Sequence, residues 1–429
     1  MNPQGNLLLV GATDDTVRKA KKLGLTVLLL QHPSKLTAEQ ETLADVVRVV
    51  DYTDWEQAEP VVRELARDPG FRVALSLTEP GLEPAGRVND MFGLGGTSLA
   101  VAHRIRDKWE MRRHLGERGV RTVEAQRVTD RASLEAFLAE HGPFIVKPVD
   151  GTASFGIFLV REAGDVDRVW AQVRDLQGRR TDRGSTLFFI DDFLMEQYVD
   201  GPEFSVESFS FAGRHVIVAV TEKFVAPGFA ELGHVVPARI PRRQWDDISE
   251  YVVQFLDAIG IRDGVCHTEL RVGPDGPVVI ESHNRIGGDA IPDLVRGVYG
   301  LDLSTYALAW PFGLVEELPE APQPRGAGSS RFLISEPGRV ESVEGVEAAA
   351  ALPDVLEVRV TAHPGDAVRE LHDNWDRLGL VAVHAPDPDA AIRRGAEVLR
   401  ETVRVLVTGP DGVTRPAQVA AVQPLGVAV

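Results

Sequence analysis

GVCHTELRVGPDGPVVIESHNR, residues 264–285, is typical of two β-strands joined by a tight turn. Proline, aspartate and glycine at 274–276 favour a three-residue loop with a left-handed glycine at its end. Such a loop would place Gly273 opposite Pro277. Because pairing continues residue by residue from the turn, this assumption fixes the partner of every later residue in the hairpin.

The predicted register sets Glu269 opposite Glu281 and His267 opposite His283, with all four side chains on one face. Two opposed carboxylates about 5 Å apart at their Cβ atoms repel unless a cation lies between them. Oxygen ligands favour Mg²⁺, although the histidines would also permit Mn²⁺ or Zn²⁺. The pattern therefore predicts a metal site; the alternative is an exposed hairpin face with ordinary charges.

Residues 143–160 are predicted to form a strand, a flexible loop and a second strand. Gly151, Ser154 and Gly156 would let backbone N–H groups approach an anion, and Lys147 ends the first strand with a compact positive charge. Phosphate is the ligand that suits this loop. A plain flexible turn is the alternative, since the chain contains no G-x-x-x-x-G-K-[ST] motif.

The N-terminal region alternates short apolar strands with helical patterns. This order predicts a parallel, doubly wound α/β domain over residues 1–105. Thr78 and Glu79 follow the last of these strands, at the sheet edge where open α/β folds bind ligands, and could touch a substrate. The predicted strands are 7–10, 26–30, 46–50 and 73–77, and 55–67 is one of the predicted helices.

Downstream the pattern changes to neighbouring strands joined by tight turns, which predicts an α+β domain over 106–317. Its small subdomain is expected at about 120–195 and its large subdomain at about 196–317. The Pro/Gly-rich stretch 318–328 is interpreted as a linker, and 329–429 as a small C-terminal α/β accessory domain.

The composition of the chain argues against several classes of function. The 429 residues carry a net charge of −18, which disfavours nucleic-acid binding. A single cysteine, Cys266, excludes an internal disulfide and a multi-cysteine zinc site. The chain start does not resemble a secretion signal, and no run of about 18 apolar residues is present, so we expect a cytoplasmic protein with no membrane span.

Motifs scattered along the chain resemble those of the ATP-grasp superfamily, over roughly residues 5–315. Each is degenerate alone, but their conjunction in this order is specific. They are Asp107-Lys108-Trp-Glu-Met-Arg112, Lys147-Pro148, the Gly/Ser loop, Glu196-Gln197-Tyr-Val199 with Gly201 and Glu203, Glu269, and Glu281-Ser-His-Asn-Arg285-Ile-Gly-Gly288-Asp289.

The resemblance implies a nucleotide site. Lys108 and Lys147 would be the two phosphate-contacting lysines, with Ser154 in a flap over the β and γ phosphates. The segment from Glu196 through Gln197 to Val199 would be the hinge that pairs with adenine, and Glu203 would hold the ribose hydroxyls. Glu269 and Glu281 match the family's Mg²⁺ carboxylates, in agreement with the register. Taken singly, these side chains are ordinary surface or strand-end residues.

Within the superfamily, the two glutamate motifs look most like those of the L-amino acid ligases and dipeptide synthases. In that branch the arginine matching Arg285 neutralises the substrate carboxylate and the developing oxyanion. A structural salt bridge is its alternative role. The family commonly has asparagine where this chain has His283; Asn284 is next door, but strand alternation would point it away. Gly288, in the same motif, is a further candidate for substrate contact.

The segment 223–238 resembles the loop with which this branch shapes its substrate pocket. Glu231 and His234 are candidates for holding an amino group, and a capping loop is the alternative. The amine must lose a proton during attack, and His267, His283 or Glu231 could accept it.

We therefore expect an ATP- and Mg²⁺-dependent carboxylate–amine ligase that forms an acylphosphate and acts on small molecules, with amino acids as substrates; a homodimer is compatible with the sequence. Two alternatives remain open. One is an ATP-grasp carboxylase or purine-pathway ligase, and the other is a nucleotide-binding regulatory protein without turnover.

Overall fold

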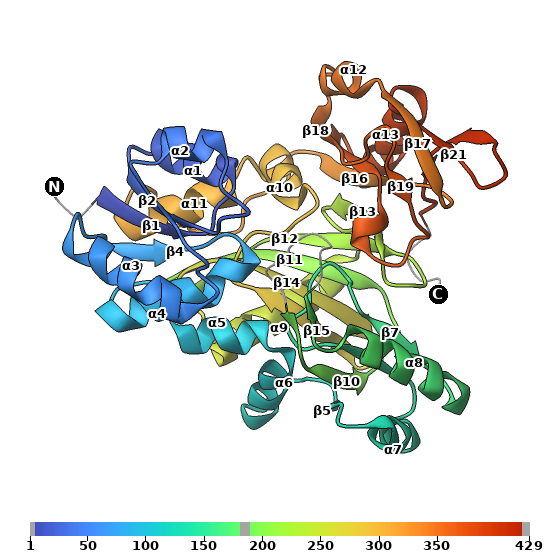
Figure 1. The fold of residues 1–429 in the computed structure, drawn as a ribbon, viewed down its shortest axis with the longest axis horizontal. Helices are drawn as coiled ribbons and strands as arrows, with labels where there is room; N and C mark the ends of the chain where they lie inside the picture. The colour runs from blue at the N-terminus through green and yellow to red at the C-terminus, as the bar shows by residue number, and fades with distance from the viewer. Residues whose placement is uncertain (1–4, 181–188, 423–429) are drawn as a thin grey trace.

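The computed structural model describes residues 5–180 and 189–422, arranged around a large twisted sheet (Figure 1). The predicted combination of α/β and α+β parts is confirmed. The ends of the first and last predicted domains, 1–4 and 423–429, and part of the small subdomain, 181–188, lie outside the described residues. No helix within the described ranges is long and apolar enough to cross a membrane.

The N-terminal domain contains a four-stranded parallel sheet in the order β3-β2-β1-β4. Alternate residues of β1 enter different cores: Leu7 and Leu9 pack with α1, whereas Leu8 and Val10 pack with α3 and α4. Both faces are thus covered, as a doubly wound sheet requires. The elements are β1 (Asn6–Val10), α1 (Asp14–Lys22), β2 (Thr26–Gln31), α2 (Ala38–Leu43), β3 (Val46–Val49), α3 (Trp55–Arg67), β4 (Val73–Leu75), η2 (Glu79–Gly81) and α4 (Leu82–Phe92).

A smaller antiparallel sheet follows, in the order β5-β10-β6-β7, with α7 and α8 on one side. Two helices, α5 and α6, lead into it from the N-terminal domain (Figure 1). The elements are α5 (Leu99–Arg106), α6 (Lys108–Glu117), β5 (Ala125–Arg127), α7 (Arg131–His141), β6 (Phe144–Pro148), β7 (Phe158–Val160), α8 (Ala163–Leu176), β8 (Arg179–Arg180), β9 (Phe189–Ile190) and β10 (Phe193–Gln197).

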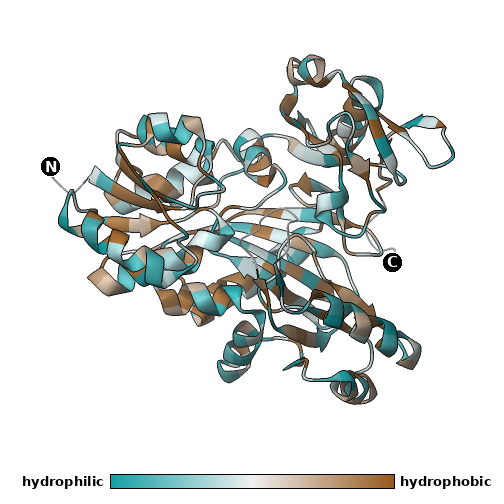
Figure 2. Cartoon of the chain, in the orientation of Figure 1, coloured by the Kyte–Doolittle hydropathy of each residue, from teal (hydrophilic) through white to brown (hydrophobic). Residues whose placement is uncertain are grey.

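The large sheet has nine strands in the order β15-β14-β11-β12-β13-β16-β20-β18, with β23 also paired to β16. Its strands are rich in apolar residues, whereas polar residues gather on the outer helices (Figure 2). The elements are β11 (Glu203–Phe211), β12 (Arg214–Val225), β13 (Glu231–Val236), α9 (Arg242–Ile259), β14 (Gly264–Gly273), β15 (Gly276–His283), α10 (Ile291–Tyr299), α11 (Leu303–Ala309), η3 (Trp310–Phe312), β16 (Ala327–Ile334), β18 (Val355–Val360), β20 (Gly379–Ala385) and β23 (Gln418–Val419).

The C-terminal region adds a second sheet, β19-β17-β21-β22, to strands that belong to the large sheet. The chain passes the Pro/Gly-rich stretch 318–328 and at once pairs β16 with β13. The domain boundaries given by the sequence remain predictions, but the sheet itself runs across the predicted linker. The remaining elements are β17 (Gly338–Glu344), α12 (Val346–Ala350), β19 (Ala367–Val368), η4 (Asn374–Asp376), α13 (Pro388–Glu401), β21 (Arg404–Thr408) and β22 (Thr414–Pro416).

The segment 223–238 is mostly strand, which corrects its interpretation as a loop. β12 runs to Val225, and Glu231 already begins β13. This strand forms because it is paired on both sides, with β12 and with β16, whose residues lie about a hundred positions away in the chain. The two predicted substrate residues in this segment therefore sit on a strand.

The hairpin of β14 and β15 has the predicted pairs for a different reason. Gly273 faces Gly276, not Pro277, so the turn is one residue tighter than predicted. A β-bulge then leaves Ile280 without a partner between the pairs Leu270–Val279 and Glu269–Glu281. The extra residue compensates for the shorter turn. Glu269 is thus opposite Glu281, and His267 is opposite His283.

Candidate active site

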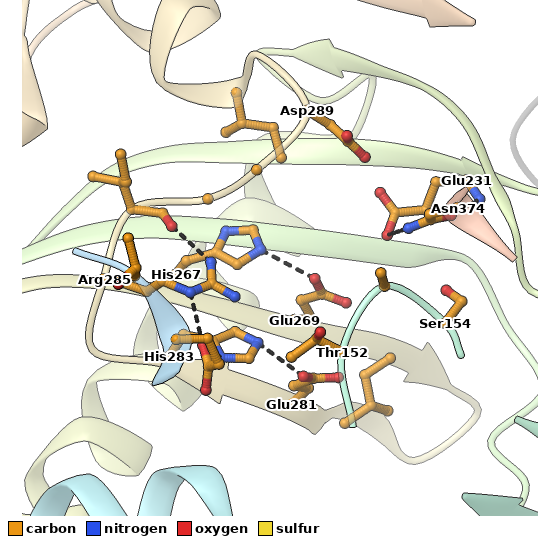
Figure 3. A pocket seen from close by; sticks show the side chains of 18 of the residues that line it. Thr152, Ser154, Glu231, His267, Glu269, Glu281, His283, Arg285, Asp289 and Asn374 are labelled. Carbon is orange, nitrogen blue, oxygen red and sulfur yellow. Dashed lines mark hydrogen bonds and ion pairs between the residues drawn. The ribbon is translucent and has the colours of Figure 1, made fainter. Parts of the chain in front are cut away.

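A cavity of about 800 Å³ lies where the N-terminal domain, both central sheets and the C-terminal region meet. Figure 3 shows the end of it formed by the β14–β15 hairpin and the loop after β6. Most of the predicted site residues line this cavity. They are Lys147, Ser154, Glu196, Gln197, Val199, Glu203, Glu231, His267, Glu269, Glu281, His283, Arg285 and Gly288.

Three predicted residues do not line the cavity. The Lys108 ammonium is buried behind the loop after β6, where it donates to Gly151 O at 2.8 Å. His234 points into the sheet, with Nδ1 2.9 Å from Ser330 Oγ. Asn284 directly follows β15, which ends at His283, and lines a separate cavity of about 50 Å³. In this structure, these three side chains are therefore not placed to contact a ligand in the main cavity.

The first hairpin carboxylate, Glu269, belongs to a chain of buried charges. Its Oε2 accepts from Lys223 Nζ at 2.6 Å, and its Oε1 lies 3.0 Å from His267 Nε2. The other ring nitrogen of His267 lies 2.7 Å from Glu207 Oε1. Burial alone would lower the pKa of His267, but the two carboxylates outweigh it and raise this pKa to about 10. Burial opposes ionisation of Glu269 too, yet Lys223 and His267 lower its pKa to about 2.

The second hairpin carboxylate, Glu281, has a matching set of neighbours. His283 Nε2 lies 2.8 Å from its Oε1, and Lys108 Nζ lies 3.3 Å from the same atom. His283 Nδ1 lies 2.7 Å from Glu79 Oε2, and that oxygen also accepts from Arg285 Nε at 2.7 Å. Burial opposes ionisation of Glu281, but Lys108 and His283 hold its pKa well below the usual range. The imidazole rings of His267 and His283 are stacked, with their centres 6.1 Å apart.

Arg285 is fixed at the base of the loop that follows β15. In addition to the bond from its Nε to Glu79, it donates from Nη1 to the backbone carbonyl oxygen of Ile286 at 2.8 Å. The backbone passes close to the hairpin here, because a Cβ on Gly287 would lie 2.9 Å from His267 Nδ1. A guanidinium held in this way keeps one orientation toward the cavity that it lines. Figure 3 shows it beside His283.

Lys147 and Glu196, both predicted to belong to the nucleotide site, form a buried network with Arg112, for which the sequence predicted no role. Lys147 Nζ lies 2.5 Å from Glu196 Oε1, and Arg112 Nε donates to Glu196 Oε2 at 3.0 Å. Arg112 also donates to the carbonyls of Val279 and Ile280, at 2.7 and 3.0 Å. Burial lowers the pKa of Lys147, and Glu196 works against that shift. The motif containing Arg112 gave a signal, although the sequence alone did not say what this arginine does.

The loop after β6 is a tight turn that lines the cavity. Ala153 and Ser154 both have φ of +59°, so two successive residues without glycine's freedom adopt the left-handed conformation. Thr152, Ala153 and Ser154 line the cavity together with Lys147, the last residue but one of β6. Backbone N–H groups in such turns converge on an anion. We refer to residues 151–156 as the flap.

The far end of the cavity is lined by Gln197, Tyr198 and Val199. Arg271, which the sequence analysis did not single out, organises this end. It donates from Nε to Glu203 Oε2 at 3.1 Å and from Nη1 to Val199 O at 3.1 Å. Its guanidinium carbon also lies 5.4 Å from the centre of the Tyr198 ring. Polar backbone and a ring here suit a heterocyclic base and its sugar.

Glu231 lines the part of the cavity beside the C-terminal region. Its Oε1 lies 3.2 Å from Lys223 Nζ, and its Oε2 lies 2.7 Å from His234 Nε2. Lys223 Nζ also lies 3.0 Å from Glu203 Oε1, so this lysine is shared among Glu203, Glu231 and Glu269, a role that the sequence did not reveal. Burial opposes ionisation of Glu231, but Lys223, His234 and Arg377 together outweigh it and keep its pKa well below the usual range.

The hairpin carboxylates suit a divalent cation. Glu269 and Glu281 are opposite each other, both line the cavity, and both are ionised at neutral pH because their pKa values are lowered. Carboxylate oxygens are the ligands that Mg²⁺ prefers. His267 and His283 direct their Nε2 atoms at these carboxylates, so they act as neighbours that orient the oxygens.

Comparisons with known proteins agree with this arrangement. Residues 140–293 match the family described as ATP-grasp domain, and residues 331–407 match L-amino acid ligase C-terminal domain 2. Alanine–anticapsin ligase of Bacillus subtilis is 27% identical over 280 residues, which are 61% of this chain. Uncharacterized protein y4rH of Sinorhizobium fredii is 29% identical over 329 residues, 75% of this chain. The matched parts span 59% and 66% of those two relatives, less than two thirds of their length.

The fold has a close counterpart among solved structures. L-amino acid ligase from Bacillus licheniformis superposes with a TM-score of 0.78, covering 95% of this chain and 100% of that one at 21% identity. Residues 140–293 are thus an ATP-grasp domain, as the motifs indicated. More narrowly, residues 331–407 match the C-terminal domain of the L-amino acid ligases, so the resemblance to that branch is also confirmed.

Proposed function

We propose that the protein is an ATP-dependent carboxylate–amine ligase that joins amino acids or closely related small molecules, releasing ADP and phosphate. A carboxylate oxygen of the first substrate attacks the γ phosphorus of ATP, and the bond to ADP breaks. The amine of the second substrate then attacks the carbonyl carbon of the acylphosphate, and the bond to phosphate breaks. The amine's proton passes to a cavity-lining acceptor, for which His283 is the candidate, because the pKa of His267 is raised and that of Glu231 is held well below the usual range.

The protein's own residues bind and neutralise charge along this path. The cavity end with Gln197, Val199 and Glu203 would take the base and ribose, while the flap and Lys147 would hold the phosphates. Glu269 and Glu281 would hold Mg²⁺, which supplies charge neutralisation at the transferred phosphate. Mn²⁺ would fit the same oxygen donors.

Arg285 is the residue placed to bind the substrate carboxylate. A planar guanidinium matches a carboxylate with two parallel hydrogen bonds and stabilises negative charge that develops on it. Its backbone anchor at Ile286 and its pairing with Glu79 fix its direction before the substrate arrives. Enclosure between the flap and the C-terminal region would keep water from the acylphosphate.

The observation that carries this proposal is the placement of Arg285 in one cavity with the two ionised hairpin carboxylates. Alanine–anticapsin ligase, by its name a ligase that joins alanine to another small molecule, supports the amino-acid substrate class.

The proposal is tested by measuring Mg²⁺-dependent phosphate release from ATP with pairs of standard amino acids, and by mass spectrometry of each mixture. One pair should release phosphate and give a product whose mass is the sum of the two minus one water. Phosphate release stimulated by bicarbonate without an amino acid would favour a carboxylase instead. ATP binding without turnover on any acceptor would favour a regulatory protein.

A further inference from the structure

Residues 373–377 of the C-terminal region reach the active-site cavity. They include the short helix η4, and Asn374, Trp375 and Arg377 all line the cavity. Asn374 is 7% exposed, whereas the Trp375 side chain is still partly open to solvent. A segment of the accessory domain is therefore part of the wall around the reacting groups.

Asn374 contacts two parts of the site that are far apart in sequence. Its backbone N–H donates to Ala153 O, at the tip of the flap, at 3.2 Å. Its side-chain Oδ1 accepts from Glu231 N at 2.8 Å, and its Nδ2 donates to Glu231 Oε1 at 3.1 Å. The backbone of one residue thus holds the flap while its amide holds the start of β13. Figure 3 shows the bond between the Asn374 amide and Glu231.

The segment around Asn374 is firmly anchored. Arg377 donates to both carboxylate oxygens of Asp289, at 2.8 and 2.9 Å, and to Asn374 O at 2.8 Å. Its guanidinium carbon also lies 3.9 Å from the centre of the Phe332 ring. Asp289 belongs to the loop that starts with Arg285, so this anchor is attached to the active-site loop itself.

The bonds of Asn374 continue toward the hairpin carboxylates. Glu231 is bonded to Lys223, and Lys223 donates to Glu269. A continuous path of hydrogen bonds and ion pairs therefore runs from the flap tip to a carboxylate that would hold the metal. Buried polar networks of this kind favour one arrangement of all their members. The flap needs such support, because its tip has two consecutive left-handed residues.

We propose that Asn374 is a positioning residue by which the C-terminal region keeps the flap closed over the acylphosphate and Glu231 oriented toward the substrates. This inference rests on the proposed ligase function. If the flap opened at the wrong time, water would attack the acylphosphate carbonyl carbon, the bond to phosphate would break, and the free carboxylate would return. ATP would then be hydrolysed without an amide product. Coupling of hydrolysis to ligation is thus the property that Asn374 controls.

Two substitutions separate the two contacts. Asn374→Ala keeps the N–H bond to the flap and removes the amide bonds to Glu231. Asn374→Pro removes both; proline is compatible here because Asn374 is the first residue of η4 and Asp373 before it is extended. His372→Ala is the matched control, since its side chain is exposed on the same segment.

The ratio of phosphate released to amide formed is the primary measurement. It should rise about three- to tenfold in Asn374→Ala, as expected for losing a buried hydrogen bond, and further in Asn374→Pro. Hydrogen exchange at the amides of 151–156 should accelerate in Asn374→Pro but little in Asn374→Ala. His372→Ala should match the wild type in both measurements.

The possible results distinguish a failure of the role proposed for Asn374 from a failure of the proposed ligase function. Wild-type coupling and flap exchange in both variants, in protein that still ligates, would overturn the role of Asn374 and leave the ligase proposal intact. A parallel loss of phosphate release and ligation at a constant ratio would also overturn it, because a merely structural role predicts that result. A wild-type protein that forms no amide with any pair would overturn the proposed function first.

Discussion

The two hairpin carboxylates have nearly equivalent surroundings built from different parts of the chain. Glu269 is contacted by a histidine and a lysine, and that histidine is held by a second buried glutamate, Glu207. Glu281 has the same sequence of neighbours, ending at Glu79. We call these the Glu269 half and the Glu281 half of the site.

The two halves differ in which part of the chain supplies the residues that contact each carboxylate. In the Glu269 half, Glu207 on β11 is paired with His267 by the sheet register, and Lys223 comes from β12 of the same sheet. In the Glu281 half, Glu79 belongs to the N-terminal domain, and its carboxylate also holds Arg285. The first half is therefore complete once the sheet forms, whereas the second requires docking of another domain. Under the proposed function, substrate orientation would depend on the second half.

The largest effect is expected from removing the charge of either carboxylate. Glu269→Gln and Glu281→Gln should each reduce Mg²⁺-dependent phosphate release by about 10²–10³-fold, because a preorganised charge at the transferred phosphate is lost. A phosphate-release assay over a range of Mg²⁺ concentrations measures this. Glu250→Gln, on the exposed face of α9, is the control. A large loss in only one of the two would show that the halves are not equivalent in metal binding.

Arg285→Ala should affect only the step that the Glu281 half orients. We expect ligation to fall by about 10²–10³-fold while ATP binding stays measurable, because the guanidinium acts on the carboxylate that reacts. Product mass spectrometry and nucleotide-binding calorimetry give the two readouts. Arg296→Ala on α10 removes a half-exposed arginine and is the matched control. Ligation at the wild-type rate in Arg285→Ala would refute the assigned role.

Glu79 and Glu207 are the glutamates that contact the histidine of each half, so Glu79→Gln and Glu207→Gln test the two halves in the same way. Glu79→Gln should lower kcat/KM for ligation by about 10–100-fold, the usual cost of losing a residue that orients a functional one. Glu207→Gln should change kcat/KM less than Glu79→Gln does, since Glu207 does not contact Arg285. Steady-state kinetics in both substrates tests the order. Glu83→Gln, next to η2 but outside the cavity, is the control. Equal losses of kcat/KM in the two variants would mean that the contact of Glu79 with Arg285 makes no additional contribution to ligation.

The smallest effect on activity is expected at Cys266, beside the Glu269 half. Burial raises the pKa of its thiol to about 12, and Glu207 adds to the shift. The native protein should react slowly with a thiol reagent near neutral pH, and quickly once unfolded in guanidinium chloride. The neutral thiol's contribution to the free energy of unfolding is complete below the unfolded pKa of 9.0 and is lost as pH rises toward 12. Fast labelling of the native state would contradict this burial.

The sequence predicted the pairs in the hairpin although its turn was assigned one residue too long. The bulge that compensates depends on groups distant in the chain: Arg112 binds the carbonyls of Val279 and Ile280, and Tyr251 Oη accepts from Val279 N. Lys147 reaches Ile280 O as well. A local pattern of turn residues contains no information about such partners. Strand alternation, in contrast, is local, and it correctly placed Asn284 away from the main cavity.

Other parts of the site show the same limit. Motif order pointed to Lys147, Glu269, Glu281 and Arg285, all of which line one cavity. Lys223 and Arg271 were missed because an isolated lysine or arginine on a strand has no distinctive pattern until the facing carboxylates are known. The strand β13 was missed because its partner β16 follows the predicted linker.

The pairing of β13 with β16 also limits how this protein can be re-engineered. A chimera that exchanged the C-terminal region at the Pro/Gly-rich stretch would replace β16 and thus one side of β13. If the incoming strand did not match, the backbone N–H and C=O groups of β13 would form an open edge, which invites aggregation. Grafts that aim to change acceptor preference should therefore keep residues 327–334 with the recipient.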